Sequence, residues 1–270
     1  MKRACQKRSE RGFSLIEMMI AALIFILLCS AAFALLSVAQ QRYQTESQVL
    51  NSFQEARFGL DEIVRDVNGS GYPRQSQFSI MPNIPPANMY AITPVAWSTG
   101  YPNSPCPIGT CATPGDFDLI IERDVDPWRH DGVEWTRYQL NNNILSRSQT
   151  YKVPGNDPAN TTQDSFVPYV QNVMNNDPTL SLSSTQLAQF KAAYPNMFPG
   201  GNPVAVFSYT CYTPFGPQPC VSAGSYNSPI NVTDVEITLI VMAPTQDTQT
   251  GLPRLIELHG RGHSLNAVQQ

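Results

Sequence analysis

The most regular feature of the chain is an apolar tract that runs from Met18 to Ala39. Of its 22 residues, only Ser30, Ser37 and the thiol of Cys29 interrupt the hydrocarbon. A helix of that length spans about 33 Å, which is enough to cross the roughly 30 Å hydrocarbon core of a bilayer. The pattern therefore predicts a transmembrane helix near the start of the chain.

Beyond this tract the chain turns polar at Arg42, but apolar residues continue to recur at helical spacing. They follow one another at intervals of four and three residues, as one face of a helix requires: Val49, Phe53, Ala56, Leu60, Ile63 and Val67. The segment Asn68–Pro73 supplies a C-cap glycine and then a proline, which together end a helix. The pattern predicts one helix of about 55 residues, apolar all round in its first half and apolar on one face in its second.

The rest of the chain is typical of loops followed by strands. Seven prolines lie between Gln75 and Cys111. Later runs of alternating or β-branched residues predict strands over residues 116–123, 133–140, 144–147, 166–173, 204–209, 232–243 and 254–259. Residues 183–194 predict a short helix capped by Ser183 or Ser184. We therefore expect an α+β fold in which the long helix packs on an antiparallel β-sheet with long loops.

A lone carboxylate, Glu17, opens the apolar tract. A charge at the middle of a membrane helix costs at least about 2.5–3.5 kcal/mol, so it is retained mostly where it has a partner or a function. A basic leader and the run Gly12–Met19 surround it. This run resembles the N-terminal cleavage and methylation motif of type IV prepilins and type II secretion pseudopilins. The alternative is a plain membrane anchor or an ordinary signal peptide, whose apolar region of about 7–15 residues contains no acid.

The resemblance implies a processing site and an assembly residue. In that family a membrane prepilin peptidase cuts after the glycine and N-methylates the new first residue. Carried over to this chain, the cut falls between Gly12 and Phe13, and Phe13 becomes the methylated N-terminus. Glu17 is then the characteristic glutamate that meets the terminal amine of a neighbouring subunit.

The globular part shows a second, looser resemblance. The helix segment Phe53–Tyr72 is similar to that of PilW-type minor pilins and J-type minor pseudopilins, and so are four later segments: residues 133–147, 206–209, 235–239 and 255–259. Residues 174–203 match nothing in that group, and we interpret them as an insertion.

Charge is distributed unevenly along the chain. The formal net charge is −4, from 17 basic and 21 acidic residues. The leader, residues 1–12, carries five of the basic residues and one acid, so the remainder has 12 against 20 and a net charge of −8. The positive-inside rule keeps the leader in the cytoplasm and sends the globular part to the periplasmic side. An acidic chain argues against nucleic-acid binding by bulk charge.

These features predict an organisation into four parts. We expect a cleaved cytoplasmic leader at 1–12, the transmembrane half of the helix at 13–39, its amphipathic half at 40–70, and a periplasmic or extracellular β-rich domain at 71–270. The protein would be a single-pass inner-membrane protein that later enters a filament, with the cell surface as a further location.

The cysteines differ in their surroundings. Cys5 lies in the leader, and Cys29 lies in the apolar tract, where it behaves as a small apolar residue. Four others lie in the predicted extracytoplasmic domain: Cys106, Cys111, Cys211 and Cys220. An even number in an oxidising compartment indicates two disulfides with three possible connectivities. The spacings favour Cys106–Cys111 and Cys211–Cys220, and a zinc site is disfavoured because no second ligand pair has zinc-like spacing.

No residue pattern in the globular part predicts catalysis or a cofactor. Of the histidines His130, His259 and His263, the last two would need a helix to share a ligand site, and Gly260 and Gly262 oppose one. The acid pairs Asp116/Asp118 and Asp124/Asp126 lack the spacing of an EF-hand, so we interpret them as solvated strand ends, although calcium binding stays open. Six aromatic residues are interpreted as core packing, with a binding surface as the alternative: Trp97, Trp128, Trp135, Tyr90, Tyr101 and Tyr138.

Three functions compete on this basis. The first is a minor pilin or pseudopilin, a non-enzymatic structural subunit that primes or enters a type IV pilus-like filament. Its expected partners are the prepilin peptidase, other major and minor pilins or pseudopilins, an inner-membrane assembly platform and membrane lipid. The second is a major pilin, which the size and the loop-rich insertions disfavour. The third is a membrane-tethered periplasmic enzyme or binding protein, which would need a convergent polar site.

Overall fold

The structure is a computed structural model that describes residues 14–78, 86–96, 115–129, 131–175, 183–199, 204–246 and 251–266. The chain divides into two compact units, Met1–Gln48 and Val49–Gln270. One helix, α1 (Leu15–Asn68, 54 residues), contributes to both units. The prediction of a single long helix is confirmed.

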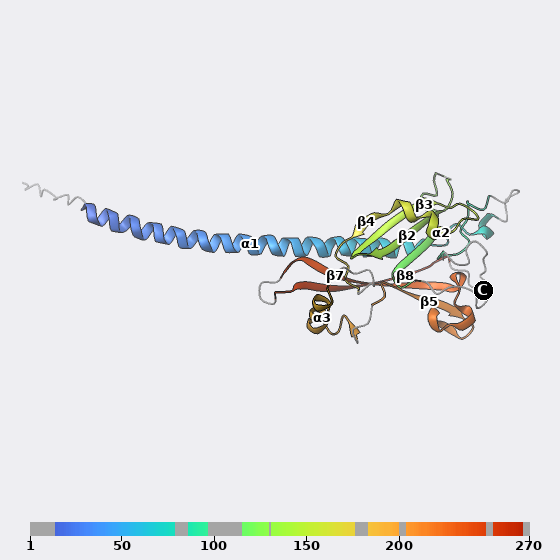
Figure 1. Ribbon diagram of the computed structural model, residues 1–270. Coiled ribbons are helices and arrows are strands. Elements are labelled where there is room, and N and C mark those ends of the chain that lie inside the picture. Colours follow the sequence, from blue (N-terminus) through green and yellow to red (C-terminus); the bar gives the residue numbers. More distant parts are fainter. Residues whose placement is uncertain are drawn as a thin grey trace, which may run out of the picture. The chain divides into compact units, whose positions relative to one another are not determined.

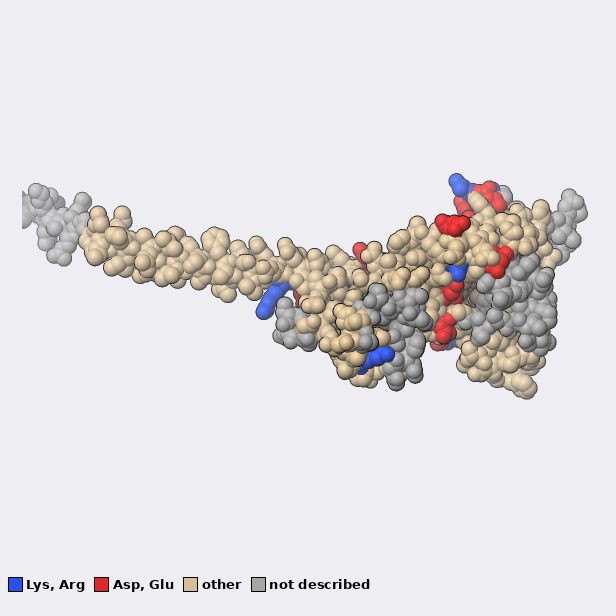
Figure 2. Space-filling view, in the orientation of Figure 1, with Lys and Arg blue, Asp and Glu red and all other residues tan. Residues whose placement is uncertain are grey.

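Helix α1 begins and ends where the residue pattern places its boundaries. The tract Met18–Ala39 contains no Lys, Arg, Asp or Glu, and Figure 2 shows the N-terminal part of α1 correspondingly free of blue and red. At the other end the amide of Gly69 donates to the carbonyl of Arg65, and Gly71 adopts a φ of 76°, which favours glycine. The helix therefore ends in a turn just before Tyr72.

The described strands form two four-stranded antiparallel sheets rather than the single sheet that we expected (Figure 1). The first sheet has the order β1-β2-β3-β4 and comprises β1 (Asp118–Arg123), β2 (Glu134–Asn141), β3 (Ile144–Tyr151) and β4 (Val167–Val170). The second has the order β6-β5-β7-β8 and comprises β5 (Phe207–Thr213), β6 (Gly216–Pro219), β7 (Val232–Gln246) and β8 (Pro253–His263). The α+β, pilin-like architecture is confirmed, because a long N-terminal helix precedes antiparallel strands.

Short helical elements connect these strands. They are η1 (Gln75–Phe78), α2 (Pro158–Thr161), η2 (Gln163–Ser165), α3 (Ser184–Ala193), η4 (Cys220–Ser222), η5 (Gly224–Tyr226) and η6 (Pro229–Asn231). The prediction of a short helix within residues 183–194 is confirmed by α3, and Ser183 is its cap. Ser183 and Gln186 form a capping box, in which each side chain bonds the backbone of the other residue.

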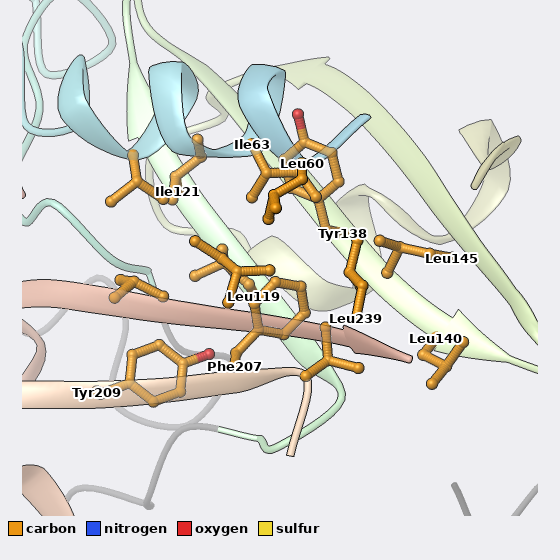
Figure 3. Packing of buried hydrophobic residues seen from close by; sticks show 14 of the residues in the cluster. Leu60, Ile63, Leu119, Ile121, Tyr138, Leu140, Leu145, Phe207, Tyr209 and Leu239 are labelled. Carbon is orange, nitrogen blue, oxygen red and sulfur yellow. The ribbon is translucent and has the colours of Figure 1, made fainter. Parts of the chain in front are cut away.

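The C-terminal part of α1 packs between the two sheets. Its residues Ala56, Leu60, Ile63 and Val67 are buried in one hydrophobic core with side chains from both sheets. Figure 3 shows Leu60 and Ile63 of α1 above Leu119, Tyr138, Phe207 and Leu239 of the strands. The predicted apolar stripe is therefore the face that holds the helix in the globular unit.

Glycines allow α1 to approach strand β8 closely. A Cβ atom built on Gly262 would lie 2.5 Å from the Val67 side chain, and one on Gly260 would lie 2.8 Å from Leu60. Both distances are shorter than side chains tolerate, so only glycine fits under the helix at these positions. On the other flank of α1, Gly59 faces Val170 of β4 in the same way.

A smaller core lies under α3. Phe190 of α3 and Phe198 pack there with Met174, Ile240 and Leu255. The segment interpreted as an insertion therefore folds onto strands β7 and β8 with apolar contacts of its own.

Candidate functional site

The first turn of α1 contains the only acid of the helix's apolar half. The backbone N–H of Ser14 donates a 2.9 Å hydrogen bond to Oε2 of Glu17. Ser14 and Glu17 have the spacing of a capping box, in which the third residue of the helix bonds back to the cap. Glu17 thus satisfies an otherwise unpaired amide of its own helix, a local role that the sequence analysis missed. The Ser-x-x-Glu spacing is the signal that predicts it.

The expected processing residues lie just outside the described residues. Gly12 and Phe13 directly precede Ser14, which is the first residue that the structure describes. Their assignment as the cleavage junction therefore stays a prediction of the sequence. Glu17 itself is exposed in the structure, within one turn of that junction.

Helix α1 is long and apolar enough to cross a membrane, and its most apolar window has no buried residue. Exposed side chains of this tract include Leu23, Phe25, Leu28 and Phe33. Cys29, in the same tract, is a half-buried free cysteine. The apolar N-terminal half therefore fits a single-pass membrane anchor.

Apolar side chains also lie on the outer face of α1 where the helix enters the globular unit. Leu50 and Phe58 are exposed there, Phe58 by 72%. Three exposed polar residues, Gln54, Asp61 and Arg65, lie on the same side of the helix at helical spacing. At 3.6 residues per turn this exposed strip lies between the arc of α1 that contacts β8 and the arc that contacts β4. The spacing of apolar residues in the sequence predicted only the buried stripe.

The globular unit contains a disulfide between Cys211 of β5 and Cys220 of η4. Their Cα atoms are 4.8 Å apart and nine positions separate them along the chain. The bridge closes the β5–β6 hairpin, as the spacing of these two cysteines predicts. Cys106 and Cys111, the other expected pair, lie outside the described residues.

The histidines form no ligand set within the part of the chain that the structure describes. His259 and His263 lie on strand β8, so the absence of a helix there agrees with the expectation from Gly260 and Gly262. Nδ1 of His263 lies 3.1 Å from Oδ1 of Asp234. Burial raises the pKa of Asp234, but hydrogen bonds from Thr233, His263 and Arg261 outweigh it, so the pKa falls below its ordinary value. His130 lies outside the described residues.

The acid pairs beside β1 have protein partners. Asp118 accepts hydrogen bonds from Nε and Nη2 of Arg137, at 2.8 and 2.5 Å. Asp126 pairs with Arg129 at 3.6 Å. No group of three His, Cys, Asp or Glu among the described residues is arranged to hold a metal ion.

A buried polar cluster joins α1 to the first sheet. Asp66 is fully buried, and its carboxylate lies 2.5 Å from Nη2 of Arg123 and 3.4 Å from Nη2 of Arg147. It also accepts a 2.6 Å hydrogen bond from the hydroxyl of Tyr138. Burial, together with the neighbouring Asp66 carboxylate, raises the pKa of Tyr138 far above its ordinary range, so the phenol stays protonated and donates. Asp66 is not part of the apolar stripe that the sequence predicted for α1.

A second buried ion pair fixes the segment that follows η1. Nζ of Lys152 donates to Oε1 of Glu122, and both side chains are fully buried. The same carboxylate oxygen accepts from the amide of Ile92, and Nζ of Lys152 also donates to the carbonyl of Tyr90. Burial lowers the pKa of Lys152, and the charge and hydrogen bond of Glu122 offset only part of that decrease. This pair anchors residues 90–92 over strand β1.

The aromatic residues separate into core and surface. Trp135 and Tyr138 are fully buried, as expected for core packing, but Trp128 is 91% exposed. Core packing is therefore wrong for Trp128. Trp97 and Tyr101 lie outside the described residues.

Comparison with protein families finds one match. Residues 7–33 match the model of the prokaryotic N-terminal methylation motif. No curated protein and no solved structure matches the chain. The match spans residues 7–12 of the leader, the expected junction, Glu17 and the first part of the apolar tract.

Proposed function

From the N-terminal methylation motif at residues 7–33, we propose that this protein is a minor pilin or pseudopilin, a structural subunit that primes or enters a type IV pilus-like filament. The motif supports a type IV pilin- or pseudopilin-like protein, and it implies processing by a prepilin peptidase and assembly with pilins. The observation that carries the proposal is this motif placed on the first turn of a helix long enough to cross a membrane.

The finer assignment rests on the globular unit. A long helix followed by antiparallel strands agrees with the PilW-type minor pilins and J-type minor pseudopilins, to which segments of the chain are similar. The loop-rich connections and the α3 insertion favour a minor rather than a major subunit. The basic leader favours an orientation with the N-terminus in the cytoplasm and the globular unit in the periplasm.

We assign the protein a structural rather than an enzymatic role. Its buried charged groups are held by one another, as Asp66 is by Arg123 and Glu122 is by Lys152. Such pairs stabilise the position of α1 and of the neighbouring loop. Perturbed pKa values also arise in structural ion-pair networks, so these groups do not require a catalytic role.

Assembly in this proposal depends on the charge of Glu17. Cleavage before Phe13 creates a cationic amine, which N-methylation leaves charged. A carboxylate in hydrocarbon is stabilised when it meets a cation, and the amine of a neighbouring subunit supplies one. The hydrogen bond from Ser14 gives Glu17 a second role within its own helix, so an experiment has to separate the two roles.

Two substitutions make that separation. Glu17→Gln keeps an oxygen that accepts from the Ser14 amide but removes the charge, whereas Glu17→Ala removes both. If the charge docks the subunit, both variants are inserted and cleaved normally yet co-purify poorly with partner pilins. Glu17→Asp, whose shorter side chain reaches less far, should be intermediate.

The outcome that contradicts the proposal is equally specific. If Glu17→Gln assembled as well as the natural chain and only Glu17→Ala failed, Glu17 would act as a helix cap and not as a docking charge. Assembly of both variants at the natural level would remove Glu17 from assembly altogether.

A further inference from the structure

The edges of the two sheets differ in how their outward main-chain groups are satisfied. The outer edge of β1 is covered, because the amide of Ala96 donates to the carbonyl of Ile120 and the amide of Glu122 donates to the carbonyl of Pro94. Strand β4 is only four residues long and contains Pro168. Short edges and prolines are two of the ways in which proteins protect a sheet from pairing with another chain.

Strand β6 is closed by proline. Thr213 and Gly216 face each other across the two-residue turn of the β5–β6 hairpin and form its innermost pair. Because amides of an antiparallel strand alternate in direction, the next outward positions are Pro217 and Pro219. Neither has an N–H, so this edge has no donor for an additional strand.

Strand β8, at the opposite edge of the same sheet, is open. Two hydrogen bonds fix the direction of its amides: Ser264 N–H donates to Thr233 at the start of β7, and His263 N–H donates away from β7 to Oδ1 of Asn68. By alternation, Glu257, His259 and Arg261 turn their N–H and C=O groups outward. Among the described residues, these three amides have no hydrogen-bond partner. The edge is also long, since β8 has 11 residues and no proline after Pro253.

The charged side chains of β8 do not obstruct this edge. Arg261 and His263 lie on the outer face of the sheet and are held by Asp234 of β7, at 3.0 and 3.1 Å. His259 lies beside Thr238 and Glu257 on the same face. The charges are therefore paired within the sheet and leave the outward main chain free.

The open edge lies beside the exposed strip of α1. Leu60 and Val64 of α1 pack on Gly260 of β8, and the exposed strip with Leu50 and Phe58 adjoins that contact on the helix. Because the strip adjoins β8, another subunit packed on the strip would bring its own chain close to this edge. Only an extended backbone offers donors and acceptors at the two-residue spacing of Glu257, His259 and Arg261.

We propose that the edge of β8 binds an extended strand of another pilin-like subunit, main chain to main chain, over Glu257–Arg261. This inference rests on the proposed function, because it takes its partner from the same filament. The proposed strand contact is separate from any contact made through the exposed strip of α1.

The test removes one outward amide without touching the inward ones. His259→Pro deletes an N–H that the isolated subunit does not use, and edge positions of this kind accept proline. His259→Ala is the matched control, because it loses the same side chain and keeps the amide. Both variants, as full-length chains, are co-expressed with the cognate pilin-like subunits, and the amount recovered in the assembly is measured.

We expect His259→Ala to assemble like the natural chain and His259→Pro to be recovered about tenfold less, because the partner's carbonyl is left unpaired. The melting temperatures of the two variants should match. As a second measurement, hydrogen exchange of residues 257–261 in the natural chain should slow by about tenfold or more on assembly.

Two results overturn the inference. One is equal assembly of His259→Pro and His259→Ala, and the other is equally fast exchange at residues 257–261 in the free and assembled protein. Both leave the proposed function intact, because the natural chain is still recovered in the assembly in either case. Absence of the natural chain from the assembly would count against the proposed function instead. If His259→Pro melts lower than His259→Ala, the exchange measurement alone decides.

Discussion

The hydroxyl of Tyr138 on β2 donates a 2.6 Å hydrogen bond to the carboxylate of Asp66 on α1, and 72 positions of sequence separate the two residues. Arg123 and Arg147 approach the same carboxylate, so one buried acid of the helix faces two guanidinium groups and one hydroxyl from the first sheet. Because a buried carboxylate needs such partners, this cluster fixes both the depth and the rotation of α1 on the sheet.

Replacing the acid at the centre of this cluster should destabilise the globular unit. Asp66→Ala leaves two partly buried guanidinium groups and the buried Tyr138 hydroxyl without their shared carboxylate, which we expect to cost about 3 kcal/mol, the low end for a buried pair. The measurement is urea unfolding of the full-length chain in detergent. Asp61→Ala, an exposed acid of the same helix, is the control and should change stability by less than about 0.5 kcal/mol. Equal effects of the two variants would show that the buried cluster does not hold the helix.

The close approach of α1 to β8 gives a second prediction. Gly262→Ala places a methyl group 2.5 Å from Val67, so the helix or the strand must shift. We expect a loss of about 1–3 kcal/mol, as is usual for overpacking. Thermal unfolding of this variant, compared with His259→Ala on the exposed face of the same strand, measures it. A Gly262→Ala variant as stable as the natural chain would mean that α1 does not lie on β8 as closely as described.

The buried pair Lys152–Glu122 should behave as a coupled unit. Lys152→Met alone leaves the Glu122 carboxylate buried and uncompensated, and we expect it to cost about 3–5 kcal/mol. The double variant Lys152→Met/Glu122→Gln removes both charges and should recover much of that loss. A double-mutant cycle by urea unfolding tests the coupling. Strict additivity of the two single effects would contradict it.

The disulfides are tested chemically. Non-reducing peptide mapping should show Cys211 joined to Cys220 and, as the spacing of the sequence predicts, Cys106 joined to Cys111. Each bridge closes a short loop and is worth roughly 2–3 kcal/mol by loop entropy. Four free thiols or cross-paired cysteines would contradict this assignment.

The sequence predicts a helix or strand well where the residues of that segment alone determine it. The limits of α1, the cap of α3 by Ser183 and the course of β7 follow from apolar spacing, capping residues and turn residues within a few positions. Strand β6 escapes prediction because Pro217 and Pro219 argue against a strand, although their missing amides face outward at a sheet edge.

Features that depend on distant partners could not be predicted in this way. Asp66 lies off the apolar stripe of α1, and nothing near it in the sequence indicates that Arg123, Tyr138 and Arg147 will enclose it. The division into two sheets depends likewise on pairings between remote strands. Within the candidate site, the importance of Glu17 was predictable, because a charge in a membrane helix is costly. Its hydrogen bond to the Ser14 amide was predictable from the spacing of a capping box.

The mass of the mature N-terminus tests the central claim most directly. Mass spectrometry of the protein purified from the membranes or filaments of the producing cell should find an N-terminal peptide that begins at Phe13 and carries one added methyl group. A bulky or charged residue in place of Gly12 should leave the full-length precursor in the membrane. An intact Met1 terminus on the natural protein in assembled filaments would contradict the assignment as a processed pilin-like subunit.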